Sequence, residues 1–256
     1  MFKICLCSLL IMFVLSACDV SFPKETLEQD AVDFIKKETK TDTKVYKVGS
    51  TLYLDVCFDD FVSDDKNKIA EIYETLQQIV SNIVRVPLSS DAKIDFVIIS
   101  AFDPKFQTLL RIFENIDDIK LYSHQLISRE DYSERQLMEL EGLTNIKEIV
   151  DNKYDISKEE FVGKLIVSQL NNSTRSNPLI SKLMQFLDLR FSHVDQDTIY
   201  FTLKRNPEND EIIILLEQML EKEVTRNIQK YKLFSIKSAI LLDGEKNIIF
   251  TVPIKL

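Results

Sequence analysis

The sequence predicts an α+β protein built from two tandem units, each with the element order α-β-β-α-β-β, and a helical insert between them. Apolar residues recur with helical spacing in some segments and alternate with polar residues in others, so helices and pairs of strands follow one another. Short turns join the paired strands, which predicts mostly antiparallel sheets with helices on one face. A chain of 256 residues that is 45% hydrophobic can bury a sizeable core, which excludes wholesale disorder.

The first unit is expected to span residues 24–114. Its predicted elements are a helix over 24–40, strands over 44–48 and 51–58, a long helix between Asp65 and Pro87, and strands over 93–101 and 107–113. Gly49-Ser50 suits a two-residue hairpin turn between the first two strands. Asp103-Pro104 marks the turn between the last two.

Residues 115–177 are expected to form the helical insert, and residues 178–256 the second unit. In the insert, Ser128 and Ser157 are expected to cap two helices, and the first of these helices should run to about Leu140. The second unit repeats the order of the first, with a helix over 178–187, strands over 190–194 and 198–203, a long helix over 208–229, and strands over 233–241 and 247–254 around Asp243-Gly244.

The two units also correspond at a few positions in sequence. Thr51-Leu52-Tyr53-Leu54 aligns with Thr198-Ile199-Tyr200-Phe201, and Asp103 aligns with Asp243. We interpret this correspondence as an internal duplication, the alternative being two α+β halves that share an element order by chance. The pattern leaves open whether the two sheets join edge to edge or stay separate with the insert packed between them.

The N-terminus has the pattern of a secretory signal peptide. Lys3 precedes an apolar run over residues 4–15, and small residues follow it. The run is too short to span a bilayer, which needs about 20 apolar residues. The alternative is a buried N-terminal helix.

Leu15-Ser16-Ala17-Cys18 resembles the lipobox of bacterial lipoproteins. The resemblance implies that residues 1–17 are removed, that Cys18 carries a diacylglyceryl group, and that residues 18–23 tether the body to the membrane. Acyl chains on one residue give stable membrane attachment. Asp19 resembles a retention signal of enteric bacteria, which slightly favours the inner membrane. We therefore expect a protein anchored in the bacterial cell envelope, on its periplasmic side.

Lipidation would leave one free cysteine in the mature chain. Cys5 and Cys7 lie in the leader and Cys18 is used by the lipid, so Cys57 has no disulfide partner. Cys57 lies in an apolar strand pattern and is interpreted as a packed residue rather than a nucleophile.

Charge and motifs limit the possible activities. A net charge of −9 argues against nucleic acid as a partner and against binding to anionic lipid by charge alone. The sequence has no HExxH zinc pattern, nucleophile elbow, Walker A loop or dinucleotide fingerprint, so we predict no metal, no cofactor and no catalytic residue. The histidines, His124 and His193, are interpreted as surface or packed residues. The acids between the second strand and the long helix are better explained by helix capping than by calcium; they are Asp59, Asp60, Asp64 and Asp65.

A surface for association is predicted from the aromatic residues. Tyr53 and Tyr200 occupy equivalent positions on the strand face opposite the packed aliphatic residues. The candidate interaction surface comprises Thr51, Tyr53, Thr198, Tyr200 and Thr202. The alternative is that the insert covers this face.

These observations favour a non-catalytic binding or scaffold module that works with an envelope protein partner. The competing hypothesis is an envelope hydrolase that cleaves glycan through a pair of acidic residues, one with a raised pKa. A solute-binding lipoprotein is a weaker third hypothesis, because its usual parallel sheets require regular β-α-β alternation.

Overall fold

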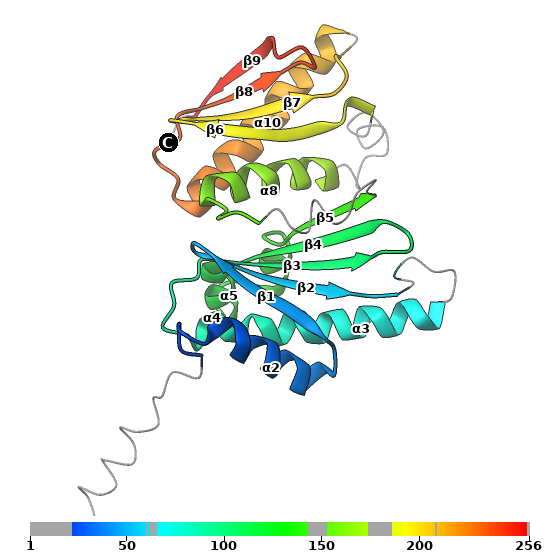
Figure 1. Cartoon of the computed structure of the whole chain (residues 1–256). Helices are drawn as coiled ribbons and strands as arrows, with labels where there is room; N and C mark the ends of the chain where they lie inside the picture. The colour runs from blue at the N-terminus through cyan, green and yellow to red at the C-terminus, as the bar shows by residue number, and fades with distance from the viewer. Residues whose placement is uncertain are drawn as a thin grey trace, which may run out of the picture. The chain divides into compact units, whose positions relative to one another are not determined.

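The computed structural model describes residues 22–59, 61, 66–142, 153–173, 186–207 and 209–254 (Figure 1). It has a mixed α+β fold with two mostly antiparallel sheets and accompanying helices, as the sequence predicts at the level of fold class. The chain divides into two compact units. The first holds the described residues up to Leu126 together with Glu139–Asp155, and the second holds Ile127–Met138 and the described residues from Ile156 onward.

The first unit is built on a sheet with the strand order β1-β2-β3-β4-β5. Its elements are α2 (Leu27–Thr39), β1 (Thr43–Val48), β2 (Thr51–Cys57), α3 (Lys66–Ile83), α4 (Arg85–Leu88), β3 (Phe96–Asp103), β4 (Thr108–Asn115) and α5 (Ile116–Ser123), and β5 (Leu137–Gly142) completes the sheet. The pairs β1/β2 and β3/β4 are antiparallel, whereas β2/β3 is parallel. A parallel pair needs a crossover connection, and α3 and α4 lie in that connection.

Helices α2 and α3 lie on one side of the first sheet (Figure 1). Helix α2 buries Leu27, Ala31 and Ile35. These residues have the helical spacing expected from the sequence. Leu52 and Leu54 of β2 are fully buried on the sheet. Apolar side chains from the strands and from the helices therefore pack together in one core.

The second unit has a four-stranded sheet with the order β6-β7-β8-β9. Its elements are α6 (Arg129–Ser133), α8 (Lys158–Ser173), β6 (Leu189–Asp195), β7 (Thr198–Leu203), α10 (Asp210–Tyr231), β8 (Ser238–Leu242) and β9 (Ile248–Pro253). The ladder is again antiparallel, parallel and antiparallel, with α10 in the crossover between β7 and β8. The helix expected over 178–187 lies almost wholly outside the described residues.

The core of the second unit lies between its sheet and helices α8 and α10. Ile199, Phe201 and Leu241 are at most 1% exposed on the strand side, and Val224 and Ile228 are fully buried on α10. Helix α8 approaches β6 so closely that a Cβ atom on Gly163 would lie 2.3 Å from the Phe191 ring. Glycine is therefore required at this position for the helix and strand to pack.

Asp103 and Asp243 have the same role in the β3–β4 and β8–β9 hairpins. Oδ1 of Asp103 accepts the backbone N–H groups of Lys105 at 2.8 Å and Phe106 at 3.2 Å. Oδ1 of Asp243 accepts those of Glu245 at 2.9 Å and Asn247 at 2.7 Å. Both aspartates therefore fix the turn that follows their strand through side-chain to backbone hydrogen bonds.

Both helix starts expected in the insert are confirmed, but one helix is much shorter than predicted. Ser128 and Ser157 accept N–H groups three residues on, from Asp131 at 3.1 Å and Glu160 at 3.0 Å. The helix after Ser128 ends at Ser133 rather than near Leu140, and Leu137–Gly142 forms strand β5. The prediction failed because the edge of β4 offers this segment backbone hydrogen bonds that its own sequence does not reveal.

Within the described part of the chain, no helix is both long enough and apolar enough to cross a membrane.

Candidate functional site

The residues expected to form an interaction surface differ strongly in exposure. In the first unit, Thr51 is fully buried and Tyr53 is 5% exposed. In the second unit, Thr198 is buried, whereas Tyr200 and Thr202 are partly exposed. Cys18 lies outside the described residues. Accessible side chains of the proposed surface therefore come from β7 of the second unit.

A short segment, Lys153-Tyr154-Asp155, covers the second face of β2 in the first unit; we call it the 153–155 strap. The Tyr53 hydroxyl donates to the Tyr154 carbonyl at 2.5 Å and accepts the Tyr154 N–H at 3.2 Å. Asp155 Oδ1 accepts the Ser50 N–H at 2.8 Å and the Thr51 hydroxyl at 2.9 Å. The polar side of β2 thus binds a segment of the same chain about a hundred residues away.

The Asp155 end of the strap is held by the β1–β2 turn. Burial opposes ionisation of Asp155, but the hydrogen bonds from the Ser50 backbone and the Thr51 hydroxyl outweigh it and lower the pKa of this carboxyl. Gly49 has a φ of +58°, and a Cβ atom there would lie 2.0 Å from Asp155 Oδ2. Glycine at this turn therefore serves both the left-handed backbone and the close approach of the strap.

The Lys153 end of the strap forms a buried ion pair with Asp55. The Lys153 ammonium lies 2.7 Å from Asp55 Oδ2, and the two side chains are only 13% and 5% exposed. The same ammonium lies 4.5 Å from the centre of the Tyr46 ring, in cation–π contact. Burial raises the pKa of Asp55, and the hydrogen bond and charge of Lys153 act against that rise.

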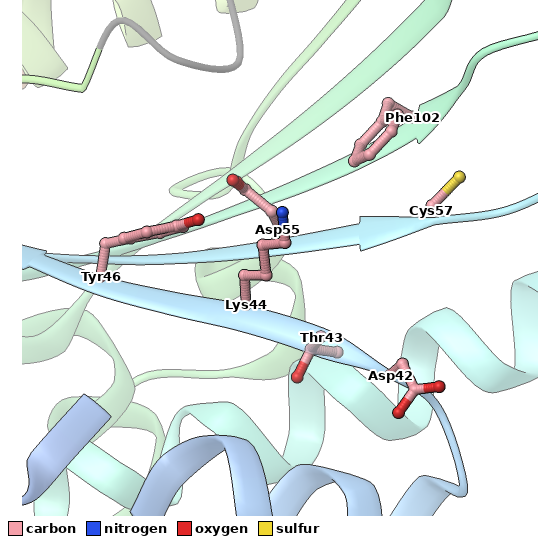
Figure 2. Close-up of a pocket in the computed structure, with 7 residues that line it drawn as sticks. All are labelled: Asp42, Thr43, Lys44, Tyr46, Asp55, Cys57 and Phe102. Carbon is pink, nitrogen blue, oxygen red and sulfur yellow. The ribbon is translucent and has the colours of Figure 1, made fainter. Parts of the chain in front are cut away.

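A hollow of about 200 Å³ opens beside Asp55 (Figure 2). It is lined by Asp42, Thr43, Lys44, Tyr46, Asp55, Cys57 and Phe102. Strand register explains part of the set, because Lys44 pairs with Asp55 between β1 and β2, and Cys57 pairs with Phe102 between β2 and β3. Ser100, which pairs with Asp55 between β2 and β3, is a second side-chain hydrogen-bond partner of this carboxyl and acts with Lys153 to lower its pKa.

Cys57 is an exposed free thiol at this hollow. Partial burial, together with the negative charges of Asp59 and Asp103, raises the pKa of the thiol. The thiolate is the nucleophilic form, so this environment keeps Cys57 in its less reactive state.

The partly exposed face of the second unit is centred on Tyr200. The ring of His193 on β6 stacks on the Tyr200 ring with centroids 4.4 Å apart and planes 2° apart. His193 Nδ1 lies 2.9 Å from the Ser192 hydroxyl. Thr198 and Ser238 share a hydrogen bond of 2.8 Å on the neighbouring strands. This face presents an aromatic pair among hydroxyl groups.

The remaining sequence candidates have modest roles where they are described. His124 follows α5 and its backbone N–H donates to the Lys120 carbonyl. Of the acidic cluster, Asp59 is described and Asp60, Asp64 and Asp65 are not. Across the described ranges, no group of three or more His, Cys, Asp or Glu side chains is arranged to hold a metal ion.

Sequence reasoning missed the residues that build the hollow and the strap. Asp55 stood out only as a polar residue on the less apolar side of β2, and Lys44 and Tyr46 only as alternating strand residues. Nothing local marks Lys153 as the partner of Asp55, because 98 positions separate them.

No protein-family model and no curated protein matches the chain.

Gly49→Ala is expected to loosen the 153–155 strap. The left-handed backbone alone costs about 1–2 kcal/mol for a residue with a Cβ atom, and the added methyl group would collide with the Asp155 carboxylate. Hydrogen exchange followed by mass spectrometry should show faster exchange in peptides covering Ser50 and residues 153–157. Gly244→Ala is the matched control, because a Cβ atom there meets its nearest neighbour at 3.4 Å. Equal exchange in the two variants would contradict the attachment of the strap at Gly49.

Lys153→Met should destabilise the first unit in a pH-dependent manner. Removing one partner of a buried ion pair costs about 3–5 kcal/mol. Because burial raises the pKa of Asp55 above 3.8, the cost is fully present at high pH and is relieved as the pH falls through the raised folded pKa. Urea unfolding at pH 8 and pH 5 measures both effects.

The control for this variant is Lys93→Met, which breaks an exposed pair with Asp95 at 3.5 Å. Exposed pairs contribute about 0–1 kcal/mol, so this change should leave the unfolding midpoint nearly unaltered. A Lys153→Met protein as stable as the wild type at pH 8 would show that the ion pair does not hold the strap.

Proposed function

We propose that this chain is a lipid-anchored protein of the bacterial cell envelope that works by association rather than catalysis. Cys18 carries the anchor, the body faces the periplasm, and Asp19 favours the inner membrane. The proposal for the anchor is supported by the lipobox pattern of Leu15-Ser16-Ala17-Cys18 after a short apolar run. The described body begins at Phe22, close behind this cysteine, so the anchor holds it near the bilayer.

The body consists of two tandem α-β-β-α-β-β units that arose by duplication. Both sheets share the antiparallel, parallel, antiparallel ladder, which supports a common origin. Thr51 and Thr198 begin the parallel ladder of their sheets, and Asp103 and Asp243 fix equivalent turns. A duplicated fold provides two equivalent sheet faces, and each face can then acquire a different role.

The observation that carries the proposal of association is the partly exposed face around Tyr200. Its aromatic ring is held by stacking on His193, so little side-chain entropy is lost when a partner covers it. Tyrosine combines apolar area with a hydroxyl group, as interfaces with proteins require. An envelope protein is therefore the proposed partner.

The chemistry of the described side chains supports association over nucleophilic catalysis. Cys57 has a raised pKa, and His193 is engaged with Tyr200 and Ser192. One observation favours the alternative, a glycan hydrolase that uses an acidic pair. Burial raises the pKa of Asp55, and Asp42 lines the same hollow. Release of reducing ends from envelope glycan, lost in Asp55→Asn, would establish that alternative.

Cys18→Ser should abolish lipid attachment and release the protein from membranes. Without a thiol at position 18 no thioether to the diacylglyceryl group can form, and the acyl chains provide the membrane affinity. Metabolic labelling with an alkyne fatty acid, followed by fractionation, measures both losses. Cys57→Ser is the matched control and should keep label and location. Label retained in Cys18→Ser would refute the anchor at this cysteine.

A photo-crosslinking residue at position 200 should capture a specific partner in native membranes. We expect Tyr200→benzoylphenylalanine to give a light-dependent adduct with one protein, identified by mass spectrometry. The matched control is the same replacement at Tyr73, which is 61% exposed on α3. Because Tyr73 is more accessible than Tyr200, random collisions should label it at least as well.

Thr202→Arg on the same face should reduce the Tyr200 adduct severalfold, since it places a bulky charge beside the contact. Equal adducts from positions 200 and 73, or recovery of lipid and monomer alone, would overturn the association model. The hydrolase assay then becomes decisive.

A further inference from the structure

In the first unit, the tyrosine in the middle of β2 binds the main chain of the 153–155 strap. The Tyr53 hydroxyl donates to the carbonyl of Tyr154 and accepts the N–H of the same residue. Polar and charged groups hold the two ends of the strap, with Lys153 on Asp55 at one end and Asp155 on the β1–β2 turn at the other. One tyrosine therefore holds the middle of a peptide segment, and complementary end groups fix its direction.

Tyr200 occupies the matching position in the second sheet. Each tyrosine pairs with an aromatic residue on its antiparallel neighbour and with an isoleucine on its parallel neighbour. The pairs are Tyr53 with Tyr46 and Ile98, and Tyr200 with His193 and Ile240. Ile98 is 2% exposed, whereas Ile240 is partly exposed. The same arrangement of side chains is therefore covered in the first sheet and accessible in the second.

Beside the β6–β7 turn, the second sheet carries acids where the first has neutral residues. Asp195 takes the place of Val48 in the ladder. Asp197 directly precedes its strand, as Ser50 does in the first sheet. Lys237 lies 3.5 Å from Asp197 and offsets one of the two negative charges. A basic group of a bound segment is therefore favoured at this end, where the strap of the first unit has an acid.

At the other end, the second sheet carries cations where the first has a buried acid. Thr202 takes the place of Asp55 and pairs with Arg190 on β6. Arg190 and Lys204 share one acid, Asp188, at 2.7 Å and 4.0 Å. Two positive charges therefore face one negative charge, and an acidic group of a bound segment is favoured here. The order of charges along the second face is the reverse of that in the first unit.

We propose that the Tyr200 face binds an extended segment of an envelope protein, in which an acidic residue, a central residue and a basic residue follow one another in the direction of the strap. The Tyr200 hydroxyl donates to the carbonyl of the central residue and accepts its N–H, as Tyr53 does with Tyr154. The acid lies toward Arg190 and the base toward Asp195. This inference rests on the association proposed for Tyr200 and names the kind of partner.

The hydrogen bonds of Tyr53 explain why the segment is extended. A helix uses its N–H and carbonyl groups internally, so an interior residue of a helix cannot offer both to one hydroxyl. An extended terminus or linker keeps both groups available. A partner that presents a helix or another folded surface would therefore not reproduce the contact seen with the strap.

Three blocked pentapeptides are the probes for this proposal. The first is acetyl-Ser-Glu-Tyr-Lys-Ser-amide, the second exchanges its Glu and Lys, and the third carries an N-methyl group on the central residue of the first. Each is titrated into the full-length protein in a neutral detergent, with isoleucine methyl groups labelled for NMR. Ile240 reports on the Tyr200 face, and the buried Ile98 of the first sheet is the internal control.

The acid-first peptide is expected to shift the Ile240 signal with a Kd of about 1 mM and to leave Ile98 unchanged. The charge-exchanged and N-methylated peptides should bind about tenfold more weakly. Tyr200→Phe keeps the ring and removes the hydroxyl, so it should also weaken the acid-first peptide about tenfold. Tyr73→Phe, which changes an exposed residue of α3, should bind like the wild type. The isoleucine spectrum also shows that each variant is folded.

Equal binding of the two charge orders, or of Tyr200→Phe and the wild type, would overturn the proposal. An Ile240 signal that moves with protein concentration alone would also overturn it, because a second copy of the chain would then occupy the face. Absence of binding by every peptide is the third contrary result. A photo-adduct obtained at Tyr200 despite that absence would show that association holds and that the partner presents a folded surface instead.

Discussion

The buried carboxylate of Asp55 is the constraint on which the first unit depends. A charged group on the middle of β2 is unfavourable unless a counter-ion reaches it, and Lys153 does so at 2.7 Å. Bringing Lys153 to this place requires Tyr154 to bond Tyr53 and Asp155 to bond the Gly49-Ser50 turn. The strap and the Gly49-Ser50 turn are therefore linked, through these contacts, to the counter-ion of one buried charge.

The same sheet architecture has two different outcomes in this chain. In the first unit, the polar side of β2 is covered, and Tyr53 is 5% exposed, with its hydroxyl donating to the Tyr154 carbonyl and accepting the Tyr154 N–H. In the second, Tyr200 remains partly exposed and is restrained by its stacking on His193. One face thus binds a segment of the same chain, whereas the equivalent face keeps Tyr200 and Thr202 partly exposed.

Features with a local cause were predictable. The Gly49-Ser50 turn follows from a backbone that needs a positive φ, and the caps at Ser128 and Ser157 follow from N–H groups that need an acceptor within one turn. The length of the helix after Ser128 was not predictable in this way. Its continuation became β5 because a distant strand edge supplied the hydrogen bonds.

By itself, the sequence determined the α+β class, the positions of most strands and the inward-facing residues, because each depends on a period of 2 or 3.6 along the chain. It also placed Tyr53 and Tyr200 on the side of their strands opposite the aliphatic core. Only the tertiary structure decided which of these faces is covered, which lysine pairs with Asp55, and that a hollow forms beside Cys57. Those outcomes depend on contacts between residues about a hundred positions apart, and no local period encodes such contacts.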